Sequence, residues 1–163
     1  MTLRLDIAIL GAPDVSAAQD FYSAALSPSV QDYGGFSRIG LHGTGDLGLT
    51  DSASLAAEAG LSPEGSGFRG YIFSYTLEQP SEVASVLDDA AAAGAEILKP
   101  AKKALFGSFS GAFRAPDGAV WKVATDKKKD TASAQSPPRP TETGVLLGVA
   151  DPKAPKSSTP RWA

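Results

Sequence analysis

The chain of 163 residues has no cysteine, one histidine and one methionine. The absence of cysteine excludes a disulfide framework and any thiolate metal site. No run of apolar residues approaches the roughly 20 that a membrane-spanning helix needs, and the N-terminal residues lack the long apolar stretch of a signal peptide. The sequence therefore predicts a soluble cytoplasmic protein.

Basic residues are also few relative to acidic ones. Lysine and arginine number 15 against 18 aspartates and glutamates, which gives a net charge of −3 and a pI near 5.1. Nucleic acids and anionic membrane surfaces attract proteins with a basic stripe, so this balance argues against both as partners. Apolar residues make up 42% of the chain, enough for the core of one domain with a tail.

A pattern of one strand, one amphipathic helix and further strands occurs twice. Residues 5–10 and 71–75 are the opening strands, and the apolar residues of the two helices match at a constant offset, with the i, i+3, i+4, i+7 spacing of a helix lying on a sheet: Ala18, Phe21, Tyr22 and Ala25, then Val83, Val86, Leu87 and Ala90. The repeat predicts an α+β fold of two βαβββ modules, residues 3–60 and 68–125. We expect a mixed curved sheet with the helices on its outer face, and a cleft between the modules.

The composition changes after residue 125. Residues 126–130 are mostly charged and residues 131–143 are rich in Pro, Ser and Thr, which predicts a disordered linker. Residues 146–154 repeat the opening of the first module, with identities at Leu10/Leu147, Gly11/Gly148, Asp14/Asp151 and Ala17/Ala154. Residues 126–163 are therefore a linker followed either by the truncated start of a further module or by a chance similarity. A lone strand here would pair with another chain or stay disordered.

Three motifs resemble those of a known superfamily. They are Ala12-Pro13-Asp14 leading to a helix that ends in Asp20-Phe21-Tyr22, the stretch Ala92-Ala93-Gly94-Ala95, and the hairpin around Ala115-Pro116-Asp117-Gly118. Together with the repeat they are similar to the vicinal oxygen chelate superfamily, which includes glyoxalase I, extradiol dioxygenases and the bleomycin and fosfomycin resistance proteins. The resemblance implies a glyoxalase-like domain over residues 1–125, in which the two modules form one cavity.

Metal-dependent members of that superfamily hold a divalent cation with His, Glu or Gln side chains on the concave face. The resemblance places Ile7, Tyr71 and Lys122 at those positions. An aliphatic chain, a neutral phenol and an ammonium group are poor ligands for a cation. We therefore expect no metal and no cofactor, and we identify no catalytic residue. His42 lies in a Gly-rich hairpin and is expected to be exposed rather than ligating.

Strand alternation suggests which side chains face the cleft. We expect Tyr71, Phe73 and Tyr75 there, together with Lys122 and Ile7, which gives an apolar, aromatic-lined pocket with one cation. Such a pocket suits a small organic ligand. In the alternative interpretation the aromatic residues fill a closed core and Lys122 extends to the rim.

Three functions remain open at this point. The first is a metal-free protein, similar to the bleomycin-resistance type, that binds a small organic molecule between its modules. The second is a metal-dependent enzyme of the glyoxalase or dioxygenase type with non-standard ligands, and the third is a non-catalytic remnant of a longer two-domain protein. The resemblance also implies a homodimer as one arrangement, since paired modules in the superfamily often come from two chains.

Overall fold

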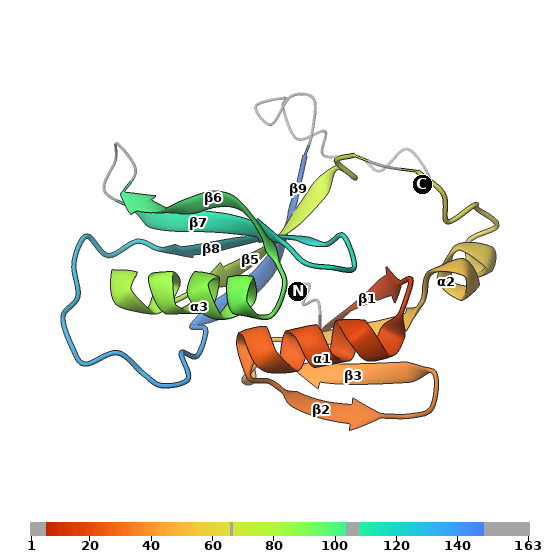
Figure 1. The fold of residues 1–163 in the computed structure, drawn as a ribbon, viewed down its shortest axis with the longest axis horizontal. Helices are drawn as coiled ribbons and strands as arrows, with labels where there is room; N and C mark the ends of the chain where they lie inside the picture. The colour runs from red at the N-terminus through yellow and green to blue at the C-terminus, as the bar shows by residue number, and fades with distance from the viewer. Residues whose placement is uncertain (1–5, 66, 104–107, 149–163) are drawn as a thin grey trace, which may run out of the picture.

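The computed structural model describes residues 6–65, 67–103 and 108–148 (Figure 1). The first module comprises β1 (Ile7–Ala12), α1 (Val15–Leu26), β2 (Ser29–Asp32), β3 (Phe36–Gly40), β4 (Asp46–Asp51) and α2 (Ser52–Glu58). The second comprises β5 (Tyr71–Thr76), α3 (Pro80–Ala92), β6 (Glu96–Lys103), β7 (Phe109–Arg114) and β8 (Val120–Thr125), and β9 (Glu142–Leu147) follows it. The two predicted βαβββ modules are confirmed.

Each module forms its own mixed sheet. The strand order is β1-β4-β3-β2 in the first sheet and β6-β7-β8-β5-β9 in the second. The opening strand of each module pairs parallel with the last one, β1 with β4 and β5 with β8, and the other pairs are antiparallel. The predicted α+β class is therefore confirmed, with two sheets of four and five strands.

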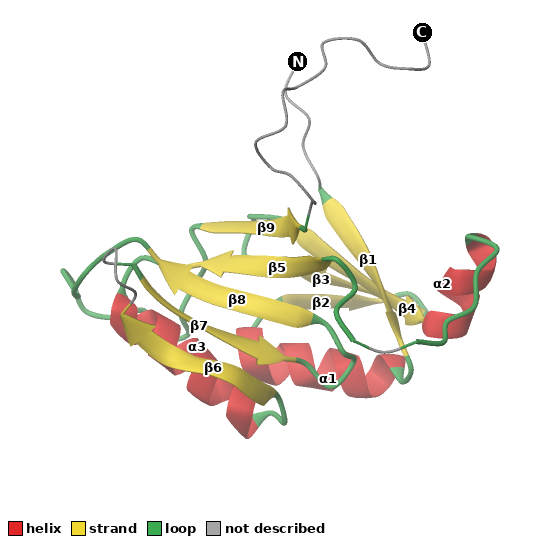
Figure 2. Cartoon of the chain, turned by 90° about the horizontal axis from the view of Figure 1, so that it is seen from above, coloured by secondary structure: helices red, strands yellow, loops and turns green. Residues whose placement is uncertain are grey.

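The helices cover one face of the strands. Helix α1 begins after Asp14, whose carboxylate accepts a hydrogen bond of 2.9 Å from the Ala17 N–H, and it ends at Ser27 in the left-handed conformation. Helices α1 and α3 contact each other and lie on the same side of the strands (Figure 2). The apolar faces predicted from the repeat, those of Ala18 to Ala25 and of Val83 to Ala90, are buried as expected.

The register between strands corrects the predicted face of the aromatic residues. Phe73 lies beside Trp121, and Ser74 lies beside Lys122. Side chains of neighbours in register point to the same face of a sheet. Phe73 and Tyr75 are accordingly buried with Trp121 on the helix side, whereas Lys122 is exposed on the opposite, open face. The interpretation that placed these aromatic residues on one face with Lys122 is wrong.

Residues 126–148 are held against the second module, which differs from the disordered linker predicted for residues 126–143. The buried Gln79 side chain accepts hydrogen bonds from the N–H groups of Thr131 and Ala132, at 3.1 and 3.2 Å, and donates one of 2.9 Å to the Ala132 carbonyl. Buried Glu82 accepts one of 2.9 Å from the Gln135 N–H. Hydrogen bonds between these two side chains and backbone groups, together with the buried Pro138 and Pro140, fix this segment, and its composition revealed neither.

Strand β9 completes the second sheet. It pairs antiparallel with β5, with Tyr71 opposite Leu147 and Thr76 opposite Glu142. The lone strand expected to pair with another chain or remain disordered therefore pairs within its own chain. The proposed start of a further module continues into residues 149–163, which lie outside the described residues, and the domain boundary at residue 125 stays a prediction.

Within the described ranges, no helix is both long and apolar enough to cross a membrane.

Candidate functional site

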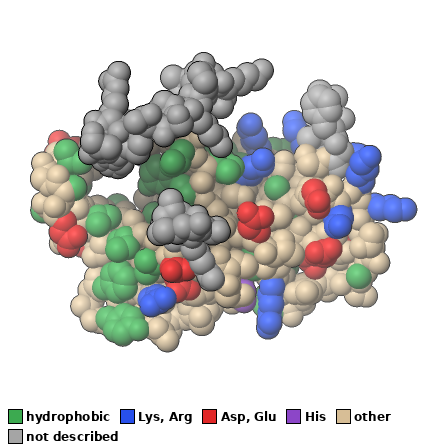
Figure 3. Space-filling model, turned by 180° about the vertical axis from the view of Figure 1, so that it is seen from behind, with side chains coloured by type: hydrophobic (Ala, Val, Ile, Leu, Met, Phe, Trp, Pro, Cys, Tyr) green, Lys and Arg blue, Asp and Glu red, His purple; other side chains and the backbone are tan. Residues whose placement is uncertain are grey.

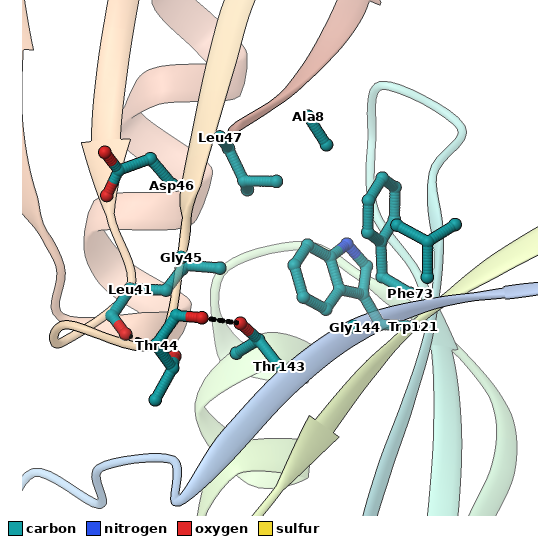
Figure 4. A pocket seen from close by; sticks show the side chains of 11 residues that line it. Ala8, Leu41, Thr44, Gly45, Asp46, Leu47, Phe73, Trp121, Thr143 and Gly144 are labelled. Atoms are coloured by element: carbon teal, nitrogen blue, oxygen red, sulfur yellow. Dashed lines mark hydrogen bonds between the residues drawn. The ribbon is translucent and has the colours of Figure 1, made fainter. Parts of the chain in front are cut away.

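A cavity of about 360 Å³ lies between the two modules (Figure 4). We call it the Trp121 cavity. Ala8 and Leu47 line it from the first sheet, and Phe73, Trp121 and Val145 line it from the second. These residues come from β1, β4, β5, β8 and β9, so the cavity exists only where the two sheets meet.

Aromatic rings form one wall of the Trp121 cavity. The rings of Phe73 and Trp121 are stacked, with centroids 4.8 Å apart and planes 26° apart. Phe113 stacks with Trp121 at 6.2 Å and 10°. The indole N–H of Trp121 donates a 3.3 Å hydrogen bond to the hydroxyl of Tyr22. The ring of Trp121 is stacked and its indole N–H is hydrogen-bonded, so this side chain is held in one orientation.

The polar side of the same cavity is formed by β9 and the β3–β4 turn. The Thr143 hydroxyl donates a 3.1 Å hydrogen bond to the Thr44 carbonyl, drawn as a dashed line in Figure 4. The Asp46 carboxylate points away from the rings in the same view, and it is paired with Arg38. The lining residues therefore direct no free charge at the space between the rings and the threonines.

A second cavity, of about 720 Å³, lies between the end of β1, helix α2, the connector before β5 and the β7–β8 turn. We call it the Asp117 cavity. Asp117 accepts a 2.8 Å hydrogen bond from the Tyr22 hydroxyl and one of 2.9 Å from the Ala119 N–H. Burial raises the pKa of Asp117, while the hydrogen bonds from Ala119 and Tyr22 oppose that rise. Burial, followed by the charge of Asp117, raises the pKa of Tyr22 well above its ordinary value, so the phenol stays a donor.

The five residues predicted to bind a ligand do not form one site. Phe73 lines the Trp121 cavity and Tyr71, 36% exposed, lines the Asp117 cavity. Tyr75 is buried in the core, and burial raises the pKa of its phenol. Ile7 and Lys122 belong to the open face of the sheets. A ligand contact by any of the five stays a prediction.

The open face, seen from behind in Figure 3, carries Lys and Arg side chains mostly on its right-hand side, where the second sheet lies. Register places Lys99 on the same face as Lys122, with Ala112 between them. Among the residues that surround them in register are Ser74 and Gly144, both small. This half of the open face carries Asp and Glu side chains among the Lys and Arg ones (Figure 3), and Lys99 and Lys122 on it are not cation ligands.

The superfamily's metal positions can be tested by comparing the two modules. The helix caps Asp14 and Gln79 are equivalent, which makes Ile72 in β5 the counterpart of Ile7 in β1. The position assigned to Tyr71 from the sequence therefore moves by one residue, to Ile72. An isoleucine side chain has no atom that can coordinate a cation, so Ile72 offers no ligand at this position.

The last strand of each module gives the second pair of equivalent positions. Gly48 lies beside Ile9, and Lys122 lies beside Ser74 in the equivalent place. Neither residue offers an oxygen or imidazole ligand. No three His, Cys, Asp or Glu side chains of the described residues gather in a way that could hold an ion. The superfamily's metal does not fit the residues at these positions.

His42 is half-buried rather than exposed, and its Nε2 lies 3.1 Å from the Leu26 carbonyl.

Solved structures with the same fold support the two-module description. A glyoxalase-related enzyme from Fulvimarina pelagi has a TM-score of 0.67 and 19% identity, and the match covers 91% of this chain and all of that one. A glyoxalase/bleomycin resistance protein/dioxygenase family enzyme from Burkholderia phytofirmans PsJN has a TM-score of 0.66 and 18% identity, covering 76% and 98%. Lactoylglutathione lyase from Agrobacterium tumefaciens has a TM-score of 0.58 and 20% identity, covering 76% and 94%. At these identities the likeness shows the fold alone.

No curated protein sequence matches the chain. The family model of the Glyoxalase/Bleomycin resistance protein/Dioxygenase superfamily does match it, over residues 4–123. That range contains both modules, and it includes α1 and the β7–β8 hairpin whose motifs carried the resemblance. The chain therefore belongs to the Glyoxalase/Bleomycin resistance protein/Dioxygenase superfamily.

Proposed function

We propose that the protein binds a small, neutral and planar organic molecule in the Trp121 cavity, without a metal ion. The observation that carries this proposal is the stacked pair of Phe73 and Trp121 on one wall of a space bounded by both modules. Its volume of about 360 Å³ falls within the range of small-molecule sites, roughly 300–1,000 Å³.

The chemistry of the lining supports an uncharged ligand. Ala8 and Val145 offer apolar contacts, and the buried Leu47, Phe73 and Trp121 complete the apolar side of the lining. Polar contacts come from Thr44 and Thr143 on one side only. A ligand with one apolar, planar body and one hydrogen-bonding group matches this distribution.

The same lining supports binding rather than catalysis. Acid–base catalysis needs a titratable group directed at the ligand. Asp46, the acidic residue of the lining, is paired with Arg38 and points away from the rings. Ile7 and Ile72, at the equivalent metal positions of the two modules, have no donor atom that could bind a metal ion as a Lewis acid.

A fluorescence titration with the neutral dye phenylnaphthylamine tests the proposal. We expect saturable binding to the native protein and a loss of affinity of about tenfold or more in Ala8→Phe, whose added ring occupies the cavity. Ala91→Phe, on the exposed side of α3, is the matched control and should bind like the native protein. Equal affinity of Ala8→Phe and the native protein would place the dye elsewhere and reject this cavity.

A further inference from the structure

Helix α2 has an apolar side that the protein covers only in part, since Leu55 and Ala56 are half-buried. None of its side chains is buried. Leu55 and Ala56 line the Asp117 cavity instead of the core, and Leu61, which is 70% exposed, continues the same wall. A concave apolar wall left open in the folded protein is typical of a ligand site.

Arg69 lies on the connector side of this cavity against the backbone of Gly65. A Cβ on Gly65 would lie 2.6 Å from Nη1 of Arg69 and 3.0 Å from Nη2, and Gly65 itself has a φ of +133°. A larger residue at position 65 would therefore displace the guanidinium. Arg69 makes no ion pair with any carboxylate in the part of the chain that the structure describes.

Arg114 supplies a second guanidinium to the lining. Its Nη1 donates a 2.7 Å hydrogen bond to Glu96, and the two side chains are 48% and 61% exposed. Exposed ion pairs of this kind contribute little to stability, so Arg114 can exchange Glu96 for a ligand at small cost.

The charge balance of the Asp117 cavity favours an anion. Asp117 is the one acidic residue among the described lining residues, and both of its oxygens already accept hydrogen bonds from Tyr22 and Ala119. Arg69 and Arg114, the second of which is paired with Glu96 outside the lining, bring two guanidinium groups to the cavity. Guanidinium groups bind carboxylates and phosphates through two parallel hydrogen bonds, which makes them the usual partners of organic acids.

We infer that the Asp117 cavity is a second binding site, which takes a small organic anion with an apolar body. The apolar body lies against Leu55 and Leu61, and the carboxylate or phosphate lies between Arg69 and Arg114. No residue lines both cavities, so this site is independent of the one proposed above.

Calorimetric titration of the full chain with phenylacetate, phenyl phosphate and the neutral phenylacetamide tests the inference. We expect at least one anion to bind with one-to-one stoichiometry, about tenfold more tightly than phenylacetamide. Which of the two binds better distinguishes a carboxylate site from a phosphate site. Arg69→Gln and Gly65→Ala should each weaken that anion about tenfold, because one removes the guanidinium and the other displaces it.

Two control variants distinguish this site from nonspecific charge attraction and from the Trp121 cavity. Arg38 lines neither cavity and is paired with Asp46. The substitution Arg38→Gln should therefore leave the affinity for the anion unchanged. Ala8→Phe blocks only the Trp121 cavity and should leave it unchanged as well, so the two proposals can fail separately. Absence of binding by both anions, equal affinity for phenylacetamide, or native affinity in Arg69→Gln would overturn the inference.

Discussion

The hydroxyl of Tyr22 donates a 2.8 Å hydrogen bond to the carboxylate of Asp117, 95 residues further along the chain. The same hydroxyl accepts the indole N–H of Trp121 at 3.3 Å. Tyr22 belongs to α1 of the first module, whereas Asp117 and Trp121 belong to the second. Since Trp121 lines one cavity and Asp117 lines the other, Tyr22 joins the modules at the point between the two sites.

Tyr22→Phe should lower the free energy of unfolding by about 2 kcal/mol, because it leaves the buried Asp117 carboxylate short of a donor and the Trp121 N–H without an acceptor. Urea denaturation measures the difference. Tyr33→Phe is the matched control, since the Tyr33 hydroxyl bonds only to Gln31 on an exposed hairpin, and it should change stability by less than about 0.5 kcal/mol. An equal change in the free energy of unfolding for the two substitutions would show that the hydrogen bonds of Tyr22 do not stabilise the fold.

The raised pKa of Asp117 has a consequence for stability against pH. Its folded-state pKa lies above the ordinary value of 3.8, so the native state holds the proton more tightly than the unfolded chain does. The resulting stabilisation is complete below the unfolded pKa and is lost as the pH rises through the folded one. Asp117→Asn removes this dependence. The stability of Asp117→Asn relative to the native protein should therefore increase over that window, measured by urea denaturation at a series of pH values. If the stability of Asp117→Asn relative to the native protein stayed constant or fell as the pH rises, Asp117 would not have a raised pKa in the folded state.

Tyr75→Phe should leave the free energy of unfolding unchanged or raise it by up to about 1 kcal/mol. The Tyr75 hydroxyl is buried and has no hydrogen-bond partner among the described residues, so its removal relieves a desolvation cost. Thermal or urea unfolding measures the change. A destabilisation of more than about 1 kcal/mol would mean that the hydroxyl has a partner, such as a buried water.

Chains ending at Thr125 and at Gly148 should differ greatly in stability. The shorter chain loses the partners of Gln79 and Glu82 and exposes the edge of β5, while the longer one keeps every one of these contacts. We expect the shorter chain to be less stable by about 3 kcal/mol or more, because it loses the four hydrogen bonds that Gln79 and Glu82 make with residues 131–135 and the pairing of β9 with β5. Equal urea midpoints for the two chains would show that residues 126–148 do not hold the fold together.

The sequence predicted the parts of the fold that depend on local periodicity. The spacing of Phe21 and Tyr22, and of Val86 and Leu87, identified the buried faces of both helices, because an amphipathic helix repeats its apolar positions within a few residues. An aspartate directly before such a helix is also a local signal, and Asp14 caps α1. Each of these signals lies within one element.

Features that join separate elements were not predictable in this way. The face of Phe73 depends on its register with Trp121, and alternation along a single strand does not fix that register. Gln79 and Glu82 bind backbone groups of residues 131–135, and composition carries no sign of such bonds. Asp117 was recognised only as a turn residue. The one available hint was the phenol of Tyr22, a polar group on an otherwise apolar helix face that needs a buried partner.

Metal-independent binding is the central claim, and the dye titration repeated on chelator-treated protein tests it most directly. Phenylnaphthylamine affinity would be measured without metal and after adding back nickel, zinc, manganese and iron(II) in turn. The residues at the equivalent positions Ile7, Ile72, Gly48 and Lys122 predict the same affinity under all conditions. Binding that appears only with a metal, or one ion retained per chain, would contradict the account.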